Sequence, residues 1–265
     1  MKVACGLLCY NVFATGRDGF FKRTLEVLEK EFPVLLPFTY GSTDGTGQEV
    51  QRLGGYWVKA IDPVMRTRYH KGYQMLGDML YDTGADVILI HPDDLIPYPH
   101  FADAVSRWWA EAPGDIAIAS WQLEPIYSWN EFYGFLEYGG IKGYWRAAAG
   151  GCSWSFRRDD WPWIRKWDLF EDIEVCTGFI KKGRKTVQID WGEHVGEKIS
   201  SWGNRAYEYA IPLTPETLHV HDWNEKNEKA KNTDGFLATC KFSGCQMVQM
   251  YDKKGKFLGL GRLVR

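Results

Sequence analysis

Short apolar runs alternate with helical repeats through the first half of the chain. Residues 17–30, 66–81 and 101–111 carry apolar side chains at helical spacing, and a short helix is expected after a turn at 41–46. Strands are predicted at 3–8, 34–38, 56–60, 86–90 and 115–119. Strands separated by helices of this length predict right-handed crossovers. We therefore expect an α/β fold, with a mostly parallel, Rossmann-like sheet flanked by helices.

The second half of the chain has a less regular pattern. Residues 121–151 are rich in aromatic residues and glycine without a clear period, so we assign no element to them. A helix is expected at 172–182, a strand at 186–190 and a β-hairpin at 246–264. The charged stretch 225–234 is interpreted as solvated. We divide the chain into one domain over 1–205 and a C-terminal extension over 206–265 that ends in the hairpin.

Composition is that of a globular protein. Of the 265 residues, 45% are hydrophobic and 25% charged, which is enough apolar material for a full core. The formal charge of -2 argues against a dominant electrostatic attraction to nucleic acid or membranes. No run of 18 apolar residues occurs, so no membrane-spanning helix is expected. The apolar N-terminal run is interpreted as the first strand and not as a signal peptide.

Cysteine and tryptophan are the unusual residue types. The six cysteines include no CxxC pair, and Cys5 and Cys9 are too far apart on one strand to form a disulfide. We interpret the cysteines as reduced and buried in a cytoplasmic protein. Five of the 13 tryptophans fall between residues 145 and 167. They either pack in the core or form a platform on which a sugar or base stacks.

Three polar clusters follow predicted strands, where ligands bind in open α/β sheets. They are Tyr10-Asn11, the segment 39–46, and the segment His91-Pro92-Asp93-Asp94. In the last of these, adjacent carboxylates suit Mg²⁺ or Mn²⁺, or one of them caps the next helix. The turn Gly41–Thr46 either caps a helix or holds phosphate with its amides, and it is not a P-loop.

Two further positions could carry chemistry. Glu171 and Asp172 begin the predicted helix at 172–182, where carboxylates either complement the helix dipole or serve as a general base in a cleft. Of the six histidines, His194 lies between glycines and is the best single candidate for a metal ligand.

The order of the segments is more informative than any one of them. Between residues 2 and 200 the chain presents in turn Leu8-Cys9-Tyr10-Asn11, Thr39–Thr46, Arg68–Gly72, Ile90–Asp94, Gly150-Gly151, Phe156-Arg157-Arg158, Glu171-Asp172 and Lys182-Gly183. This ordered set resembles the GT-A fold glycosyltransferases, in particular the family-2 group of inverting enzymes.

The resemblance implies a hexosyltransferase that moves a sugar from a nucleotide-sugar donor, a UDP-sugar first of all, to an acceptor hydroxyl. The donor would bind over residues 1–120 and the acceptor over 121–205. By this resemblance the donor would be contacted by Tyr10, Asn11, Thr39, Asp44, Arg68 and Gly151. Mn²⁺ or Mg²⁺ would be held by Asp93, with Asp94, His91 and His194. Asp172, with Glu171 beside it, would deprotonate the acceptor.

Some positions depart from the family pattern. Thr39 replaces a base-reading Asp, His91 replaces the first Asp of the DxD motif, and Tyr69 replaces an Asn. These changes support an alternative, a catalytically silent carbohydrate-binding module on the same fold. A third class, a nucleotidyltransferase, needs a glycine-rich loop with a basic residue after the first strand, and residues 8–16 lack that arrangement.

The acceptor is left open by the sequence. A glycan, a protein side chain and a hydroxylated base in DNA all remain candidates. Basic residues near the C-terminal hairpin either are solvated or contact phosphate; they are Lys253, Lys254, Lys256, Arg262 and Arg265.

Overall fold

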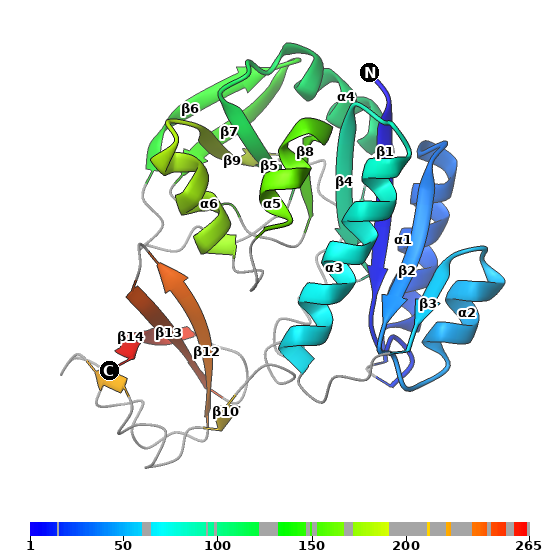
Figure 1. Cartoon of the computed structure of the whole chain (residues 1–265), viewed down its shortest axis with the longest axis horizontal. Coiled ribbons are helices and arrows are strands. Elements are labelled where there is room, and N and C mark those ends of the chain that lie inside the picture. Colours follow the sequence, from blue (N-terminus) through cyan, green and yellow to red (C-terminus); the bar gives the residue numbers. More distant parts are fainter. Residues whose placement is uncertain are drawn as a thin grey trace. The chain divides into compact units, whose positions relative to one another are not determined.

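A computed structural model of the chain describes residues 1–14, 16–59, 65–93, 95–97, 100–121, 132–146, 149, 153–166, 172–190, 211–212, 221–223, 235–242, 245–252 and 257–263 (Figure 1). The chain divides into two compact units, Met1–Ile199 and Ser200–Arg265. The boundary predicted at 205/206 lies outside the described residues.

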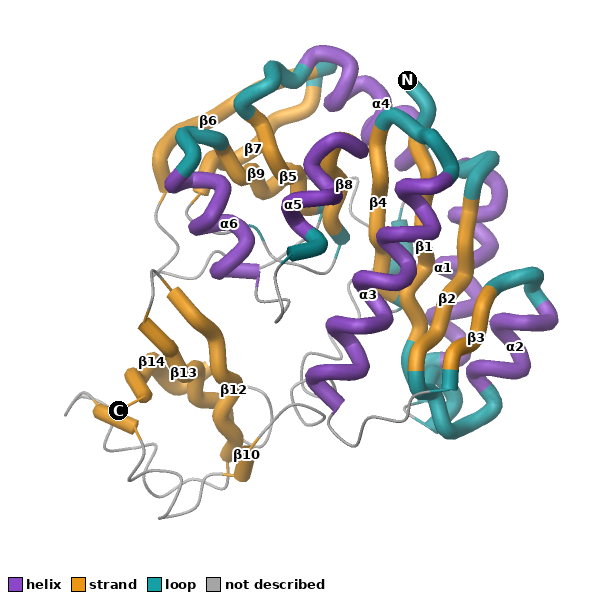
Figure 2. The backbone as a smooth tube through the Cα atoms, in the orientation of Figure 1, coloured by secondary structure: helices purple, strands orange, loops and turns teal. Residues whose placement is uncertain are grey.

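A nine-stranded sheet runs through the first unit (Figure 2). Its strands are β1 (Val3–Cys9), β2 (Leu35–Tyr40), β3 (Tyr56–Val58), β4 (Val87–Pro92), β5 (Ile116–Ser120), β6 (Phe132–Tyr138), β7 (Ile141–Arg146), β8 (Trp154–Arg157) and β9 (Lys185–Asp190). Their order across the sheet is β3-β2-β1-β4-β8-β5-β9-β7-β6. Only β7 and β8 run against the other seven. The expected α/β class with a mostly parallel sheet is confirmed.

Helices cover both faces of this sheet. They are α1 (Asp18–Glu31), α2 (Thr46–Arg52), α3 (Met65–Asp82), α4 (Phe101–Glu111), α5 (Trp161–Ile164) and α6 (Asp172–Lys181). In Figure 1, α3, α5 and α6 lie in front of the sheet, and α1 and α4 lie behind it. Close approach of helix to sheet requires glycine at Gly6 of β1, where a Cβ would lie 2.8 Å from the Leu76 side chain of α3.

The strands and helices predicted up to residue 120 and the elements at 172–190 are all present. The sequence pattern missed the hairpin β6–β7 and the strand β8. The hairpin turns at Gly139-Gly140, both with positive φ, and two glycines between alternating runs are a hairpin signal. Strand β8 is buried on both faces and only four residues long, so it shows no alternation.

The second unit contains a five-stranded antiparallel sheet. Its strands are β10 (Ile211–Pro212), β11 (His221–Trp223), β12 (Gly235–Phe242), β13 (Cys245–Asp252) and β14 (Phe257–Leu263), in the order β10-β12-β13-β14-β11. The hairpin predicted at 246–264 corresponds to β13 and β14. Of the basic residues noted there, Arg262 lies in β14, and Lys253, Lys254, Lys256 and Arg265 lie outside the described residues, as does the stretch 225–234.

Several cysteines and tryptophans belong to the core. Cys5, Cys9 and Cys176 are buried free thiols, and burial raises the pKa of Cys5 far above its ordinary range. Trp154 and Trp161 are almost completely buried, which supports the packing interpretation for these two. Among the helices in the described part of the chain, none combines the length and the apolar character needed to cross a membrane.

Candidate functional site

The strand order creates a switch point between β1 and β4. The chain leaves β1 through α1 to reach β2 on one side, and it returns through α3 to place β4 on the other side. Helix α1 follows β1 behind the sheet, and α3 precedes β4 in front of it, so these two connections lie on opposite faces (Figure 1). Ligands of open α/β sheets bind at such points, beyond the carboxyl ends of the strands.

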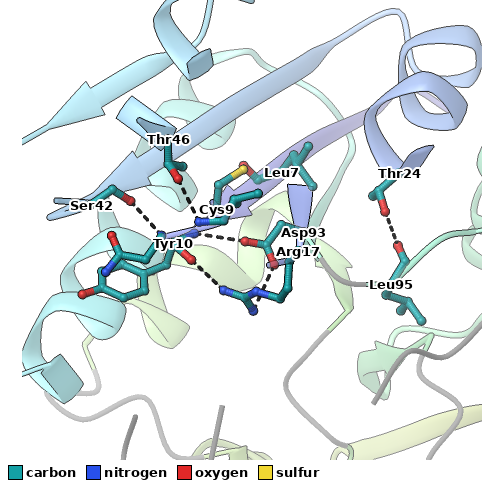
Figure 3. A network of polar contacts seen from close by, with 11 residues as sticks. Leu7, Cys9, Tyr10, Arg17, Thr24, Ser42, Thr46, Asp93 and Leu95 are labelled. Carbon is teal, nitrogen blue, oxygen red and sulfur yellow. Dashed lines mark hydrogen bonds and ion pairs between the residues drawn. The ribbon is translucent and has the colours of Figure 1, made fainter. Parts of the chain in front are cut away.

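Three residues form a closed network at this point (Figure 3). The backbone N–H of Tyr10 donates to Oδ2 of Asp93 at 3.0 Å. Nη2 of Arg17 donates to the Tyr10 carbonyl at 2.6 Å, and Nη1 of Arg17 lies 3.3 Å from Oδ1 of Asp93. The Asp93 side chain is 1% exposed and that of Arg17 is 5% exposed. The two charges therefore neutralise each other inside the protein and hold the Tyr10 peptide between them.

Side chains after β2 bind the amides of the loop that follows β1. Asn11 donates its backbone N–H to Oγ of Ser42 at 3.1 Å, and Val12 donates to Oγ1 of Thr46 at 2.8 Å. In return, Oδ1 of Asn11 accepts the N–H of Thr43 at 2.9 Å. Asn11 has a φ of 43°, in the left-handed region that Asn tolerates better than most residues. The two predicted donor-binding loops are thus bonded directly to each other.

Asp44 uses both carboxylate oxygens within this network. Oδ1 accepts the N–H of Thr46 at the start of α2, and Oδ2 accepts the N–H of Ala14 at 2.7 Å. Partial burial acts to raise the pKa of Asp44, but hydrogen bonds from Thr46 and from backbone amides outweigh it and hold the pKa below its ordinary value. Asp44 lies one residue before the N-cap of α2, Gly45, and its bond to the first amide of the helix agrees with the helix-start interpretation of the turn.

Thr39 and Tyr10 differ in accessibility. Thr39 is completely buried, and its Oγ1 lies 2.6 Å from Oγ of Ser42. Tyr10 is half-buried at the end of β1. Of these two predicted donor contacts, only Tyr10 has exposed surface.

His91 is enclosed in the core. Its Nε2 lies 2.7 Å from the carbonyl oxygen of Leu95, and its Nδ1 lies 2.9 Å from Oγ of Ser153. Both ring nitrogens of His91 are therefore engaged. Oδ2 of Asp93 accepts the N–H of Tyr10, whereas Oδ1 is paired with the guanidinium of Arg17 at 3.3 Å without a hydrogen bond. In this arrangement both nitrogens of His91 have other partners, and the positive charge of Arg17 lies against Oδ1 of Asp93, so these two members of the predicted metal set do not fit a divalent cation. Among the described residues no group of three or more His, Cys, Asp or Glu side chains is placed to hold a metal.

The remaining predicted residues are only partly placed. Arg68 lies in the first turns of α3, and Asp172 is the first residue of α6, with only their backbones described. Asp94, Gly151, Glu171 and His194 lie outside the described residues. Helix α6 ends shortly before β9 begins, at the amino ends of β5 and β9, so the beginning of the helix lies toward the carboxyl-end edge of the sheet (Figure 1).

The segment before Gly150-Gly151 is attached to α6. The backbone N–H of Ala149 donates to Sγ of Cys176, and the carbonyl of Ala149 accepts the indole N–H of Trp154 at 3.1 Å. These contacts connect strand β8 and helix α6 through Ala149, which directly precedes the predicted donor segment Gly150-Gly151 in the chain.

Sequence reasoning missed Arg17. It placed Ser42 and Thr46 in the polar turn 41–46 but did not predict their contacts with the loop after β1. Arg17 occupies the N-cap position of α1 and makes no side-chain capping bond, although N-caps favour Ser, Thr, Asp and Asn. A cation at a helix N-terminus also opposes the helix dipole. An arginine at the start of this helix was thus a sign in the sequence that the residue has a role other than capping.

Comparison with known proteins finds similarity to solved structures at low sequence identity. The sequence matches no protein-family model, and no curated protein matches it significantly. Similar solved structures include a nucleotidyl transferase from Methanothermobacter, with 11% identity, 71% of this chain and 88% of that chain covered, and a TM-score of 0.46. Another is glucosyl-3-phosphoglycerate synthase from Mycobacterium tuberculosis in complex with Mn²⁺ and UDP-glucose. It has 11% identity, with 81% of this chain and 84% of that chain covered, and a TM-score of 0.44. A third is mannose-1-phosphate geranyltransferase from Thermus thermophilus. It has 12% identity, with 79% of this chain and 79% of that chain covered, and a TM-score of 0.45.

Proposed function

We propose that this protein is a glycosyltransferase that uses a nucleotide-sugar donor, a UDP-sugar first of all, and transfers the sugar with inversion to an acceptor hydroxyl. The observation that carries the proposal is the network at the β1–β4 switch point. There Tyr10, Asn11 and Asp93, three residues of the motifs that resemble family-2 glycosyltransferases, are held in one site.

The donor is proposed to lie over the ends of β1, β2 and β4. Tyr10 retains accessible surface there, so it is suited to contact a nucleoside, and the rigid loops around it reduce the ordering cost of binding. Hydrogen bonds of Thr39, Ser42 and Asp44 hold these loops in place. Arg68 and Gly151 complete the proposed donor contacts.

Asp172 is the proposed general base. The acceptor oxygen attacks the anomeric carbon, and the bond from that carbon to the donor diphosphate breaks, leaving its electron pair on the diphosphate oxygen. The hydroxyl proton passes to the Asp172 carboxylate, which must lie within hydrogen-bond reach of the acceptor. Attack opposite the leaving group inverts the anomeric centre. Glu171 is proposed to assist beside it.

A divalent cation would neutralise a leaving diphosphate when bound. Since both nitrogens of His91 have other partners and the guanidinium of Arg17 lies against Oδ1 of Asp93, we derive no step through a cation. The test therefore includes Mn²⁺ and Mg²⁺ as separate conditions. Asp94 and His194 are the remaining proposed ligands for either cation.

The test is a thermal-shift screen of UDP-, GDP-, TDP- and CMP-sugars, each with EDTA, Mn²⁺ or Mg²⁺. A ligand that binds the folded state raises Tm by mass action. We expect one nucleotide family to raise Tm and its sugar to be released or transferred, with product of inverted anomeric configuration by NMR.

Other outcomes separate the alternatives. Binding of glycans with no shift by any nucleotide-sugar would contradict the proposal and favour the silent carbohydrate-binding module. Formation of a nucleotide-sugar from a nucleoside triphosphate and a sugar phosphate would instead identify a nucleotidyltransferase. Among acceptors, a glycan, a protein and duplex DNA with hydroxylated bases are compared once the donor is known.

A further inference from the structure

Within the described part of the chain, Arg17 is a cationic partner of the Asp93 carboxylate. A buried carboxylate requires a partner charge and hydrogen bonds, and here it has the guanidinium of Arg17 at 3.3 Å and the amide of Tyr10 at 3.0 Å. Arg17 in turn donates to the carbonyl of Tyr10 at 2.6 Å. The peptide groups on both sides of Tyr10 are therefore fixed by one ion pair.

A divalent cation at the same carboxylate would meet unfavourable electrostatics. A guanidinium 3.3 Å from Oδ1 would also lie close to a metal bound at that oxygen, and like charges repel strongly where water is excluded. Accommodating both would require Arg17 to leave a buried position where it is 5% exposed, and would leave the Tyr10 carbonyl without this donor.

The position of Arg17 along the chain supports a specific role. Arginine at the N-cap of α1 neither caps the helix nor complements its dipole. Residues that break a local rule in this way are expected where a site requires them. The gain that compensates for the local cost is the contact with Asp93 and Tyr10, which joins the end of β1 to the end of β4.

We infer that Arg17 and Asp93 form a clamp that positions Tyr10, and that Asp93 acts on a bound donor through Tyr10 and not as a ligand of a divalent cation. The part that concerns the donor rests on the proposed function. The clamp itself and the absence of metal binding at Asp93 do not.

The first test is a double-mutant cycle with Arg17→Met, Asp93→Asn and both together, measured as Tm in EDTA. Each single variant leaves an unpaired buried charge or polar group and is expected to lower Tm by roughly 6 °C or more. The double variant, which removes both charges, is expected to recover part of that loss. The exposed pair Arg107–Asp103, with the same residue types at 2.8 Å, is the matched control and should show almost no change in its own cycle. Additive losses in the Arg17–Asp93 cycle would overturn the clamp.

The second test measures binding of Mn²⁺ alone by electron paramagnetic resonance. The wild type and the double variant are expected to behave alike, whether both bind Mn²⁺ or neither does. A loss of affinity of about tenfold or more in the double variant, confirmed as folded by its Tm, would show that Asp93 is a metal ligand and would overturn the inference.

The third test uses UDP as probe, in EDTA. Arg17→Lys keeps the charge and is expected to retain more UDP affinity than Arg17→Met, because a displaced Tyr10 weakens donor contact. Equal affinity in wild type and Arg17→Met would overturn the positioning role. If the wild type binds neither UDP nor any nucleotide-sugar, the proposed function fails, and the first two tests still decide the clamp.

Discussion

The side-chain oxygen of Ser155 lies 2.6 Å from the indole Nε1 of Trp121, in the buried centre of the large sheet. The same oxygen accepts the indole N–H of Trp109 at 2.7 Å. One serine in β8 thus pairs the polar atoms of two buried tryptophans, from α4 and from the residue after β5. Two large aromatic side chains can be buried here without leaving an indole donor unpaired.

Replacing Ser155 by Ala is expected to destabilise the protein by about 2–4 kcal/mol, because two buried indole donors lose their acceptor. The measurement is urea-induced unfolding followed by tryptophan fluorescence. Ser153→Ala, which removes one contact with His91, is the companion variant and should cost less. Equal losses in the two variants would contradict the assignment of two donors to Ser155.

Gly77 is expected to tolerate no side chain. In α3 a Cβ at this position would lie 2.1 Å from the ring of Trp161 in α5. Alanine favours a helix over glycine by about 1 kcal/mol, yet overpacking is expected to reverse that gain and give a net loss of about 1–3 kcal/mol. Gly19 in α1 meets open space, so Gly19→Ala is the control and should be neutral or slightly stabilising. A stabilised Gly77→Ala protein would show that α3 and α5 are not in this contact.

Asp44 is expected to contribute pH-dependent stability. Because its pKa is lower in the folded than in the unfolded protein, its contribution is complete above the unfolded pKa and is lost as the pH falls through the folded pKa. Asp44→Asn should therefore destabilise the protein at pH 7, by about 1 kcal/mol through the lost bond to the Ala14 amide. The difference from wild type should shrink toward pH 3. Unfolding free energies at several pH values measure this, and a difference that grows on acidification would refute the predicted sign.

Asp172 is expected to be required for transfer but not for donor binding. Asp172→Asn removes the proposed proton acceptor and should lower kcat by about 100-fold or more while leaving the donor Kd nearly unchanged. Asp159→Asn, at an exposed carboxylate, is the control for the loss of a negative charge. Turnover close to wild type in Asp172→Asn would exclude Asp172 as the base.

The sequence by itself determined the periodic part of this protein. Apolar runs and helical repeats predicted the strands β1 to β5 and the helices between them. Each of these elements buries apolar side chains that recur with the period of its own secondary structure. The polar clusters at Tyr10-Asn11, 39–46 and 91–94 also followed from the sequence, since they come directly after strands. Their meeting at one edge follows from a parallel sheet.

Only the tertiary structure decided what these side chains contact. The pairing of Arg17 with Asp93 joins residues 76 positions apart, and the enclosure of His91 by Leu95 and Ser153 depends on β8 lying beside β4. Strand β8 itself was missed, because a four-residue strand buried on both faces carries no period of its own. A carboxylate after a strand has the same sequence signature whether it binds a metal, a helix end or an arginine. The partner is selected by distance and burial, which the packing of the elements sets.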